Sequence, residues 1–261
     1  MIFSEDAFKG KHIVVTGASR GIGKETAIHA AACGAKVTLT GRNEEKLKET
    51  EEACNREGKV QVVRADLNDE KDRKTLVEEA EHFAPIDGLV NAAGILNTGH
   101  FREVTEQELR EVMEVNYFSM VFLTQLIYNE MAKRKKGAIV NVSSLSGLRG
   151  TDGMMAYTGS KFAVTGFTQT LALEAIRSNI RVNAVCPGFV DTEMGRQSIG
   201  AKAKREGRTF EEQWSVAEQT NPSGRITTPE EVARAILFLL SDASENVIGE
   251  SMKISGGSVM R

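Results

Sequence analysis

Two kinds of hydrophobic pattern alternate along the chain. Short runs rich in β-branched residues are almost continuously apolar, which is typical of strands buried on both faces of a sheet. The longer stretches between them repeat apolar residues with the period of amphipathic helices. The predicted strands are His12–Thr16, Lys36–Thr40, Val60–Arg64, Ile86–Asn91, Ala138–Val142, Ile180–Cys186 and Ser251–Ile254. The predicted helices are Lys24–Cys33, Asn43–Glu57, Asp69–Phe83, Thr105–Lys133, Met155–Ser178 and Val232–Leu240.

This alternation predicts the fold class. Successive strand–helix–strand units make right-handed crossovers, so they build one parallel sheet with helices on both faces. We therefore expect an α/β fold, a Rossmann-type doubly wound sheet of about seven strands, in a single domain that spans residues 1–261. Asn43 and Thr228, each followed by acidic residues, are predicted helix N-caps. The segment Glu193–Gly224 has no clear period and is predicted as a long substrate loop inserted in this domain.

Composition narrows the functional classes. The chain has 261 residues, with 33 Lys and Arg against 36 Asp and Glu, and this near-neutral balance disfavours nucleic acid or an anionic membrane as a partner. No apolar run approaches the ~20 residues of a membrane span. The amino-terminal residues lack the pattern of a secretory signal, and the three cysteines lack C-x-x-C spacing; both features favour a cytoplasmic location. The four histidines have no ligand spacing, so we expect no metal site.

The first predicted strand leads into a glycine-rich turn and then a helix. Glycines let a backbone turn tightly and approach a pyrophosphate, to which the helix N-terminus offers free N–H groups. The spacing of Gly17, Gly21 and Gly23 differs from the usual G-x-G-x-x-G, and a purely structural turn is the alternative. The strand–turn–helix context favours a dinucleotide cofactor.

The end of the second strand indicates which dinucleotide binds. NAD is usually met there by an acidic side chain, whereas the 2′-phosphate of NADP is met by an arginine. Gly41 and Arg42 occupy this position, and Arg20 in the glycine turn adds a second positive charge. Because the guanidinium fork matches phosphate geometry, we expect NADP(H) in preference to NAD(H). The alternative for Arg42 is a solvated residue paired with Glu44 or Glu45.

Tyr157 and Lys161 lie at i and i+4 near the start of a predicted helix, and so share one helical face. A neighbouring ammonium favours the phenolate and lowers the tyrosine pKa from about 10, which suits acid–base catalysis. The pair follows Ser143 and Ser144 at the end of the fifth strand, where open α/β sheets bind ligands. An ordinary surface pair is the alternative.

Together these motifs resemble the short-chain dehydrogenase/reductase family, particularly its 3-oxoacyl-(acyl-carrier-protein) reductase-like members. The matching pieces run in family order from about Lys9 to Gly257. They are Thr16-Gly17-x-x-x-Gly21-x-Gly23, Asn91-Ala92-Ala93-Gly94, Asn116, Ser144, Tyr157-x-x-x-Lys161 and Pro187-Gly188. Ala92 departs from the asparagine of many members, which concerns stability more than chemistry. The resemblance implies an NADP(H)-dependent oxidoreductase that interconverts a ketone or 3-oxoacyl group and a secondary alcohol by hydride transfer.

The resemblance also implies residue roles. Tyr157 would be the general acid and base, and Lys161 would hold the nicotinamide ribose and lower the Tyr157 pKa. Ser144 would bind the substrate oxygen, and Asn116 would distort its helix and hold a water that links Lys161 to solvent. Substrate would contact Ser144, Tyr157 and Met194. The cofactor would contact Gly17, Ser19, Arg20, Gly21, Ile22, Gly23, Arg42, Asp66, Leu67, Asn91, Ala92, Ala93, Gly94, Tyr157, Lys161, Pro187, Gly188, Val190 and Thr192.

The substrate and the assembly are less constrained. Substrate choice is expected in Glu193–Gly224 and around Leu145–Met155. Four basic residues of the former segment could attract an anionic thioester, although a solvated helix face is the simpler interpretation; they are Lys202, Lys204, Arg205 and Arg208. The helix Phe162–Ile176 is apolar around most of its circumference, and with the resemblance this implies a homotetramer, or a homodimer. An NAD-dependent hydroxyacid, steroid or polyol dehydrogenase and a non-catalytic cofactor-binding module remain alternatives.

Overall fold

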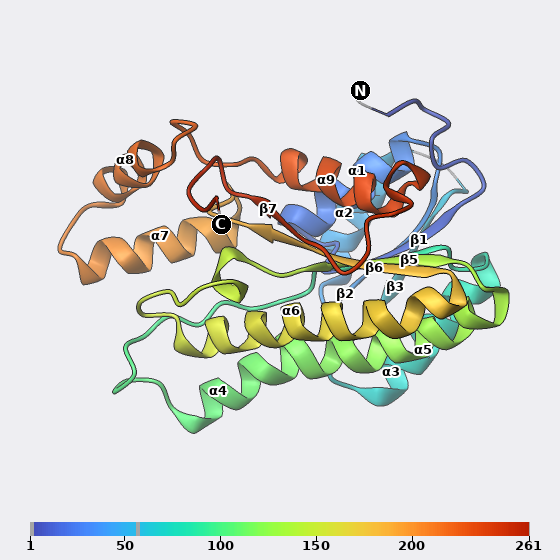
Figure 1. Cartoon of the computed structure of the whole chain (residues 1–261), viewed down its shortest axis with the longest axis horizontal. Helices are drawn as coiled ribbons and strands as arrows, with labels where there is room; N and C mark the ends of the chain where they lie inside the picture. The colour runs from blue at the N-terminus through green and yellow to red at the C-terminus, as the bar shows by residue number, and fades with distance from the viewer. Residues whose placement is uncertain (1–2, 56–57, 261) are drawn as a thin grey trace.

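One parallel sheet forms the centre of the molecule, in a computed structural model that describes residues 3–55 and 58–260. The strand order is β3-β2-β1-β4-β5-β6-β7, so the predicted doubly wound α/β fold is confirmed (Figure 1). The strands are β1 His12–Thr16, β2 Lys36–Gly41, β3 Val60–Arg64, β4 Gly88–Asn91, β5 Gly137–Val142, β6 Ile180–Pro187 and β7 Ser251–Ile254. The α-helices are α1 Gly21–Ala32, α2 Glu44–Cys54, α3 Glu70–Phe83, α4 Glu106–Met113, α5 Ser119–Arg134, α6 Met155–Ala175, α7 Glu193–Arg205, α8 Phe210–Thr220 and α9 Pro229–Leu240.

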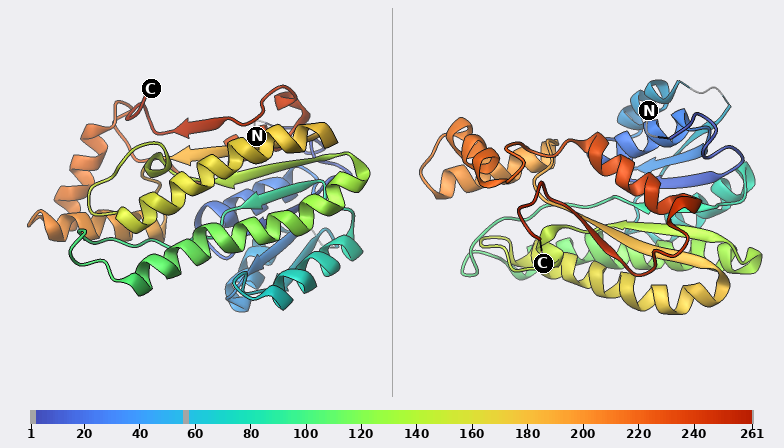
Figure 2. Two further views of the ribbon diagram at one scale, coloured as in Figure 1. Left: turned by 60° about the horizontal axis from the view of Figure 1, so that its bottom comes forward. Right: turned by 45° about the horizontal axis from the view of Figure 1, so that its top comes forward.

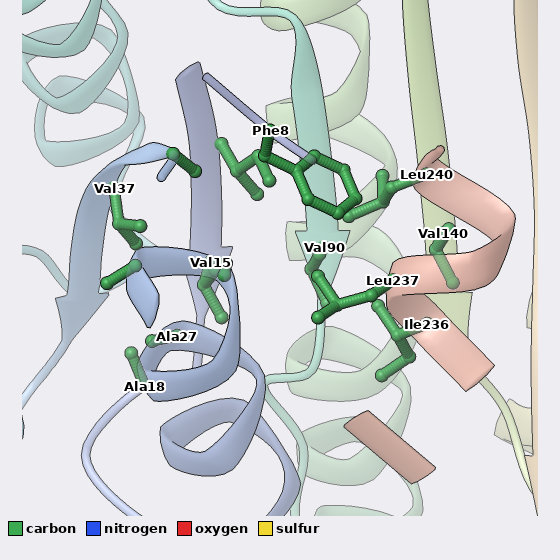
Figure 3. Packing of buried hydrophobic residues seen from close by; sticks show 14 of the residues in the cluster. Phe8, Val15, Ala18, Ala27, Val37, Val90, Val140, Ile236, Leu237 and Leu240 are labelled. Atoms are coloured by element: carbon green, nitrogen blue, oxygen red, sulfur yellow. The ribbon is translucent and has the colours of Figure 1, made fainter. Parts of the chain in front are cut away.

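Helices cover both faces of the sheet and create two apolar cores. On the face of α1, α2 and α9, Val15 and Val140 of the sheet pack with Ile236 and Leu237 of α9 (Figure 3). On the other face, side chains of α3, α5 and α6 form the second cluster. Burial of each such aliphatic side chain contributes roughly 1.5–3 kcal/mol. Because each strand is covered twice, its sequence is apolar at consecutive positions rather than at alternate ones.

His12 is a polar exception within the first strand. Its side chain is 1% exposed, and its Nδ1 donates to the carbonyl oxygen of Ala84 at 2.7 Å. Its Nε2 lies 2.8 Å from Oγ1 of Thr38 on β2. Burial lowers the pKa of His12 below its usual value, because a charged imidazolium would lose its hydration there.

The predicted helix caps at Asn43 and Thr228 are confirmed. The Asn43 side chain accepts from the backbone N–H of Lys46 at 3.0 Å. Thr228 forms a capping box with Glu231, and Pro229 occupies the first helical position. These caps satisfy N–H groups that a helix leaves unpaired at its start. They fix where α2 and α9 begin. The end predicted for α2, at residues 56 and 57, lies outside the described residues.

The single helix predicted over Thr105–Lys133 is instead interrupted. α4 ends at Met113, a π-helical turn spans Glu114–Phe118, and α5 continues from Ser119. A π turn adds one residue to a helical turn and commonly marks a functional position. This one contains Asn116, where the family resemblance implied a distortion.

The loop predicted over Glu193–Gly224 is wrong, because this segment forms α7 and α8. Thr192 accepts from the N–H of Gly195, and Thr209 forms a capping box with Glu212. The two helices project from one end of the sheet (Figure 2). Their own small core is separate from those of the sheet and consists of Ile199, Ala217 and Ile226, flanked by Phe189, Phe210 and Trp214. With so few buried positions, neither helix shows a clear hydrophobic period in its sequence.

The remaining boundaries lie within three residues of the predicted ones, the residues outside the described ranges aside. α6 continues into a 3₁₀ turn over Ile176–Ser178, which accounts for the longer predicted helix. Among the described residues, no helix combines the length and apolarity that crossing a bilayer requires.

Candidate active site

A cavity of about 620 Å³ opens at the carboxyl edge of the sheet. Its lining residues follow strands β1 to β6, whose parallel course brings their carboxyl ends to one edge. From β1 the chain adds strands toward one edge of the sheet, and from β4 it adds them toward the other edge. In open α/β sheets, ligands bind at such a topological switch point. Of the site residues predicted from sequence, all line this cavity except Asn91 and Asn116.

The glycine turn allows two close backbone approaches. Gly17 has φ of 63°, and a Cβ there would lie 2.8 Å from the backbone nitrogen of Ala93 in the loop after β4. A Cβ on Gly23 would collide with the carbonyl oxygen of Gly17. Among the described residues no side chain caps the first turn of α1, and that turn carries no acid. Its N–H groups and positive dipole end are therefore left for an anion such as a pyrophosphate.

Two arginines lie at this end of the cavity, and they differ in whether an acidic side chain pairs with them. Arg42 is exposed, and within the described residues its side chain makes no ion pair. Glu44, its predicted alternative partner, instead pairs with Lys48 at 2.8 Å. Arg20 is paired, its Nη1 lying 2.5 Å from Oε2 of Glu193 on α7. Arg42 is thus the cation open to a phosphate, whereas Arg20 already has a carboxylate partner.

The loops after β3 and β4 complete this end. Asp66 and Leu67 line the cavity, and the Asp66 carboxylate accepts from the N–H of Asn68 at 3.0 Å, so it also shapes its own turn. Asn91 lies elsewhere than expected. Its amide is buried beneath the cavity and donates to Thr124 and to Asn141, each at 2.9 Å. The Asn91 side chain therefore ties β4 to α5 and β5, and it does not line the cavity.

Tyr157, Lys161 and Ser144 come together at the centre of the cavity. The Ser144 side chain is close enough to that of Tyr157 to lower the tyrosine pKa, and Lys161 Nζ lies 5.5 Å from the Tyr157 ring centroid. Lys161 Nζ donates to the carbonyl oxygen of Val142 at 2.9 Å. The first turns of α6 and the end of β5 thus supply a phenol, a hydroxyl and an ammonium to one place.

Burial dominates the ionisation of both α6 residues. It raises the pKa of Tyr157 to about 12, against a smaller lowering by the Ser144 hydrogen bond. It lowers the pKa of Lys161 to about 8, because a buried ammonium loses its hydration. A neighbouring ammonium was expected to lower the Tyr157 pKa; in the protein alone the direction is the opposite, since burial outweighs the lowering by Ser144. The phenol is consequently protonated at neutral pH.

Asn116 connects the π turn to α6, the helix that carries Tyr157 and Lys161. Its Oδ1 accepts from the N–H of Ile95 at 2.8 Å, and its Nδ2 donates to the carbonyl oxygen of Ile95 and to Ser160 Oγ, each at 3.0 Å. Ser160 in turn donates to the backbone oxygen of Tyr157 at 2.8 Å. Asn116 therefore braces the loop after β4 against α6 with an amide whose polar atoms are all engaged.

Comparison with known proteins identifies the family. Residues 11–203 match the family model for short chain dehydrogenase. The chain belongs to the short-chain dehydrogenase family. It is accordingly an oxidoreductase that acts on CH–OH groups, in a family that binds a nicotinamide cofactor.

Similar proteins match this dehydrogenase over almost its whole length. It is 38% identical to a 3-oxoacyl-(acyl-carrier-protein) reductase of Thermotoga maritima, over 97% of this chain and 99% of that protein. It is 34% identical to an acetoacetyl-CoA reductase of an Acinetobacter species, over 96% and 98% respectively. The structure of an actinorhodin polyketide ketoreductase with NADPH is similar with a TM-score of 0.92 and 30% identity, over 98% of each chain. The structure of levodione reductase is similar with a TM-score of 0.91 and 30% identity, over 96% of this chain and 98% of that one.

The structure also gives positions at this site to residues that had no role in the sequence analysis. Ser143 Oγ donates to the backbone oxygen of Lys161 at 3.1 Å, and it shares a hydrogen bond with Thr165. Gly147 packs so closely on α6 that a Cβ would lie 2.6 Å from the Lys161 oxygen. The sequence signal for this packing is Gly147, three residues after Ser144. The need for a glycine there becomes apparent only from the structure, in which the 3₁₀ turn over Leu145–Gly147 packs against α6.

Proposed function

We propose that this enzyme is an NADPH-dependent reductase that interconverts ketones or 3-oxoacyl groups with secondary alcohols. The observation that carries the proposal is the placement of Ser144, Tyr157 and Lys161 in the same cavity as the glycine turn and Arg42. A 3-oxoacyl reductase and an acetoacetyl-CoA reductase among the relatives support a 3-oxoacyl substrate. The NADPH in the related ketoreductase structure supports the cofactor.

The cofactor end of the cavity fits NADP(H). The uncapped first turn of α1 accepts an anion, and Gly41 at the end of β2 leaves no acid to repel a 2′-phosphate. Arg42 is the group we assign to that phosphate, because its fork matches phosphate oxygens and has no competing partner within the described residues. When bound, the cofactor supplies or accepts the hydride.

The residues of the chain supply position and a proton. The Ser144 hydroxyl orients the carbonyl oxygen of the substrate by a hydrogen bond. Tyr157 donates its proton to that oxygen during reduction, and its burial keeps the phenol protonated until it is needed. Lys161, held by the Val142 carbonyl, places its ammonium beside the developing phenolate and stabilises it.

Kinetics with both cofactors test this function. Initial rates with NADPH and NADH would be measured on 3-oxoacyl N-acetylcysteamine thioesters, steroid ketones and small ketones, in both directions. Replacing the catalytic phenol by Tyr157→Phe should lower kcat by about 10²–10⁴-fold, the range for a general acid, while NADPH still binds. Tyr128→Phe, on α5 and outside the cavity, is the matched control. NADPH binding without turnover of any ketone would instead identify a non-catalytic module.

Exposed apolar residues support assembly through α5 and α6. Phe118 and Phe122 are 41% and 45% exposed, and Phe162 and Leu173 on α6 are 45% and 71% exposed. α5 and α6 run side by side over one face of the molecule (Figure 1), and contact with a second copy would bury these exposed apolar side chains. We infer a homotetramer, or a homodimer, and light scattering that finds a monomer would refute it.

A further inference from the structure

We propose that Arg149 and Lys202 bind an anionic group, a carboxylate or a phosphate, on the carbonyl substrate. The inference rests on the proposed reductase function and names the class of its substrate. Both side chains line the cavity that holds Tyr157, and the following observations assign them to substrate and not to cofactor.

The two basic residues lie on the substrate half of the sheet edge. The glycine turn, Arg42 and Asp66 follow β1, β2 and β3, which form one half of the sheet. Arg149 follows β5, and Lys202 belongs to α7, which follows β6. β4 separates β5 and β6 from that half of the sheet, so Arg149 and Lys202 follow the same side of the sheet as Ser144 and Tyr157 and not the strands that lead into the cofactor end.

The acids of the cavity leave these two charges unbalanced. Of the described residues that line it, the carboxylates are Asp66 and Glu193. Asp66 belongs to the β3 loop, and Glu193 is already paired with Arg20 at 2.5 Å. Neither therefore offsets the positive charge at the substrate end.

Each cation is available for a ligand. Within residues 3–55 and 58–260 the Arg149 side chain makes no hydrogen bond or ion pair, and it is exposed to the cavity. Lys202 lies 3.7 Å from Glu206, a partner that Arg208 binds more tightly. Such a partly exposed pair contributes little, so an anion would not have to displace a strong partner from Lys202.

Position distinguishes Lys202 from the other basic residues of its segment. Lys204, Arg205 and Arg208 do not line the cavity, and Lys204 is exposed on α7. The Arg205 guanidinium packs over the backbone of Gly153, which adds positive charge beside the loop that carries Arg149. The simple interpretation of a solvated face therefore holds for Lys204 but not for Lys202.

The apolar lining of the cavity fits the rest of such a substrate. Met154, Phe189 and Met194 line the same cavity as Tyr157, Arg149 and Lys202, and thioether side chains adapt to an aliphatic chain. A ketone with a short apolar chain that ends in an anion would place its carbonyl at Tyr157. Two sources carry this chemistry, a free oxo acid and the phosphates of a carrier thioester.

Matched substrate pairs test the proposal. Acetoacetate is compared with its methyl ester, and acetoacetyl-CoA with acetoacetyl-N-acetylcysteamine, in the wild type, Arg149→Gln and Lys202→Gln. For each pair we compare kcat/KM for the charged substrate with kcat/KM for its neutral partner. In both Arg149→Gln and Lys202→Gln, we expect this ratio to fall at least about tenfold for one of the two pairs. A tenfold loss is that expected for one charge-assisted hydrogen bond. Lys204→Gln, the control, should keep the wild-type ratio in both pairs.

The outcomes separate the sources and the hypotheses. A fall confined to the acetoacetate pair identifies a carboxylate site, and one confined to the CoA pair identifies a phosphate site. Ratios within about twofold of wild type in both pairs would overturn the proposal, with the KM for NADPH measured alongside to detect any effect on the cofactor. Reduction of the neutral ketones by the wild type would still support the reductase function, whereas its absence with every ketone would refute that function itself.

Discussion

Arg20 on the glycine turn and Glu193 on the first turn of α7 form an ion pair across the mouth of the cavity, with Nη1 and Oε2 2.5 Å apart. The pair joins segments separated by 173 residues. It also holds the pKa of the Glu193 carboxyl below its usual value, mainly through the Arg20 hydrogen bond. A cofactor phosphate would therefore compete with Glu193 for Arg20.

Glu193→Gln should strengthen NADPH binding. The change removes a negative charge near the site of the 2′-phosphate and frees the Arg20 guanidinium, so we expect the Kd for NADPH to fall about threefold or more, with a smaller change for NADH. Fluorescence titration measures both constants. Glu211→Gln on exposed α8 is the control, and unchanged or weaker NADPH binding by Glu193→Gln would contradict this role of the ion pair.

Arg42→Asp should reverse or abolish the preference for NADPH. An acid at this position repels the 2′-phosphate and accepts a hydrogen bond from the ribose 2′-hydroxyl of NAD. We expect the ratio of kcat/KM for NADPH over NADH to fall by about 10–100-fold. Arg177→Asp, a charge reversal at an exposed residue outside the cavity, should leave that ratio as it is. A wild-type ratio in Arg42→Asp would refute the assignment.

Gly147→Ala should lower both stability and kcat. The added methyl would meet the backbone oxygen of Lys161 at 2.6 Å, so the 3₁₀ turn or α6 must shift, at a typical cost of about 1–3 kcal/mol. Because that shift moves Ser144 relative to Tyr157, kcat should fall by about tenfold or more. Thermal unfolding and steady-state rates measure the two effects. Gly150→Ala has open space around the new methyl, and equal behaviour of the two variants would exclude a positioning role for Gly147.

The buried His12 should make the protein less stable in acid. Its folded-state pKa is lowered, so between that value and the unfolded value of about 6.5 the unfolded chain binds more protons. The free energy of unfolding should thus be at its plateau above pH ~6.5 and fall below it, by up to about 1.4 kcal/mol per pH unit from this residue. Urea titrations at a series of pH values should show a shallower decline in His12→Asn than in the wild type. His82→Gln, at an exposed position, should keep the full slope.

Sequence patterns were sufficient to predict the sheet and to select residues that line one cavity. The strands are apolar at consecutive positions because both faces are covered, and Tyr157 and Lys161 are four residues apart on one helix, so local spacing placed them together. Three other features depend on contacts between distant segments. The Arg20–Glu193 pair, the inward-facing amide of Asn91 and the packing of Gly147 against Lys161 all become visible only in three dimensions. α7 and α8 were missed because surface helices with a small shared core carry little periodic signal.

That small core gives α7 and α8 a stability of their own. Ile199, Ala217 and Ile226 pack with aromatic neighbours and not with the two clusters of the sheet, so the helical pair can open as a local unit while the sheet stays folded. Amide hydrogens of α7 and α8 would then exchange with solvent faster than those of β1, β4 and β5. Ser144, Tyr157 and Lys161 lie outside this helical pair, so such an opening would leave the arrangement of these three side chains in place.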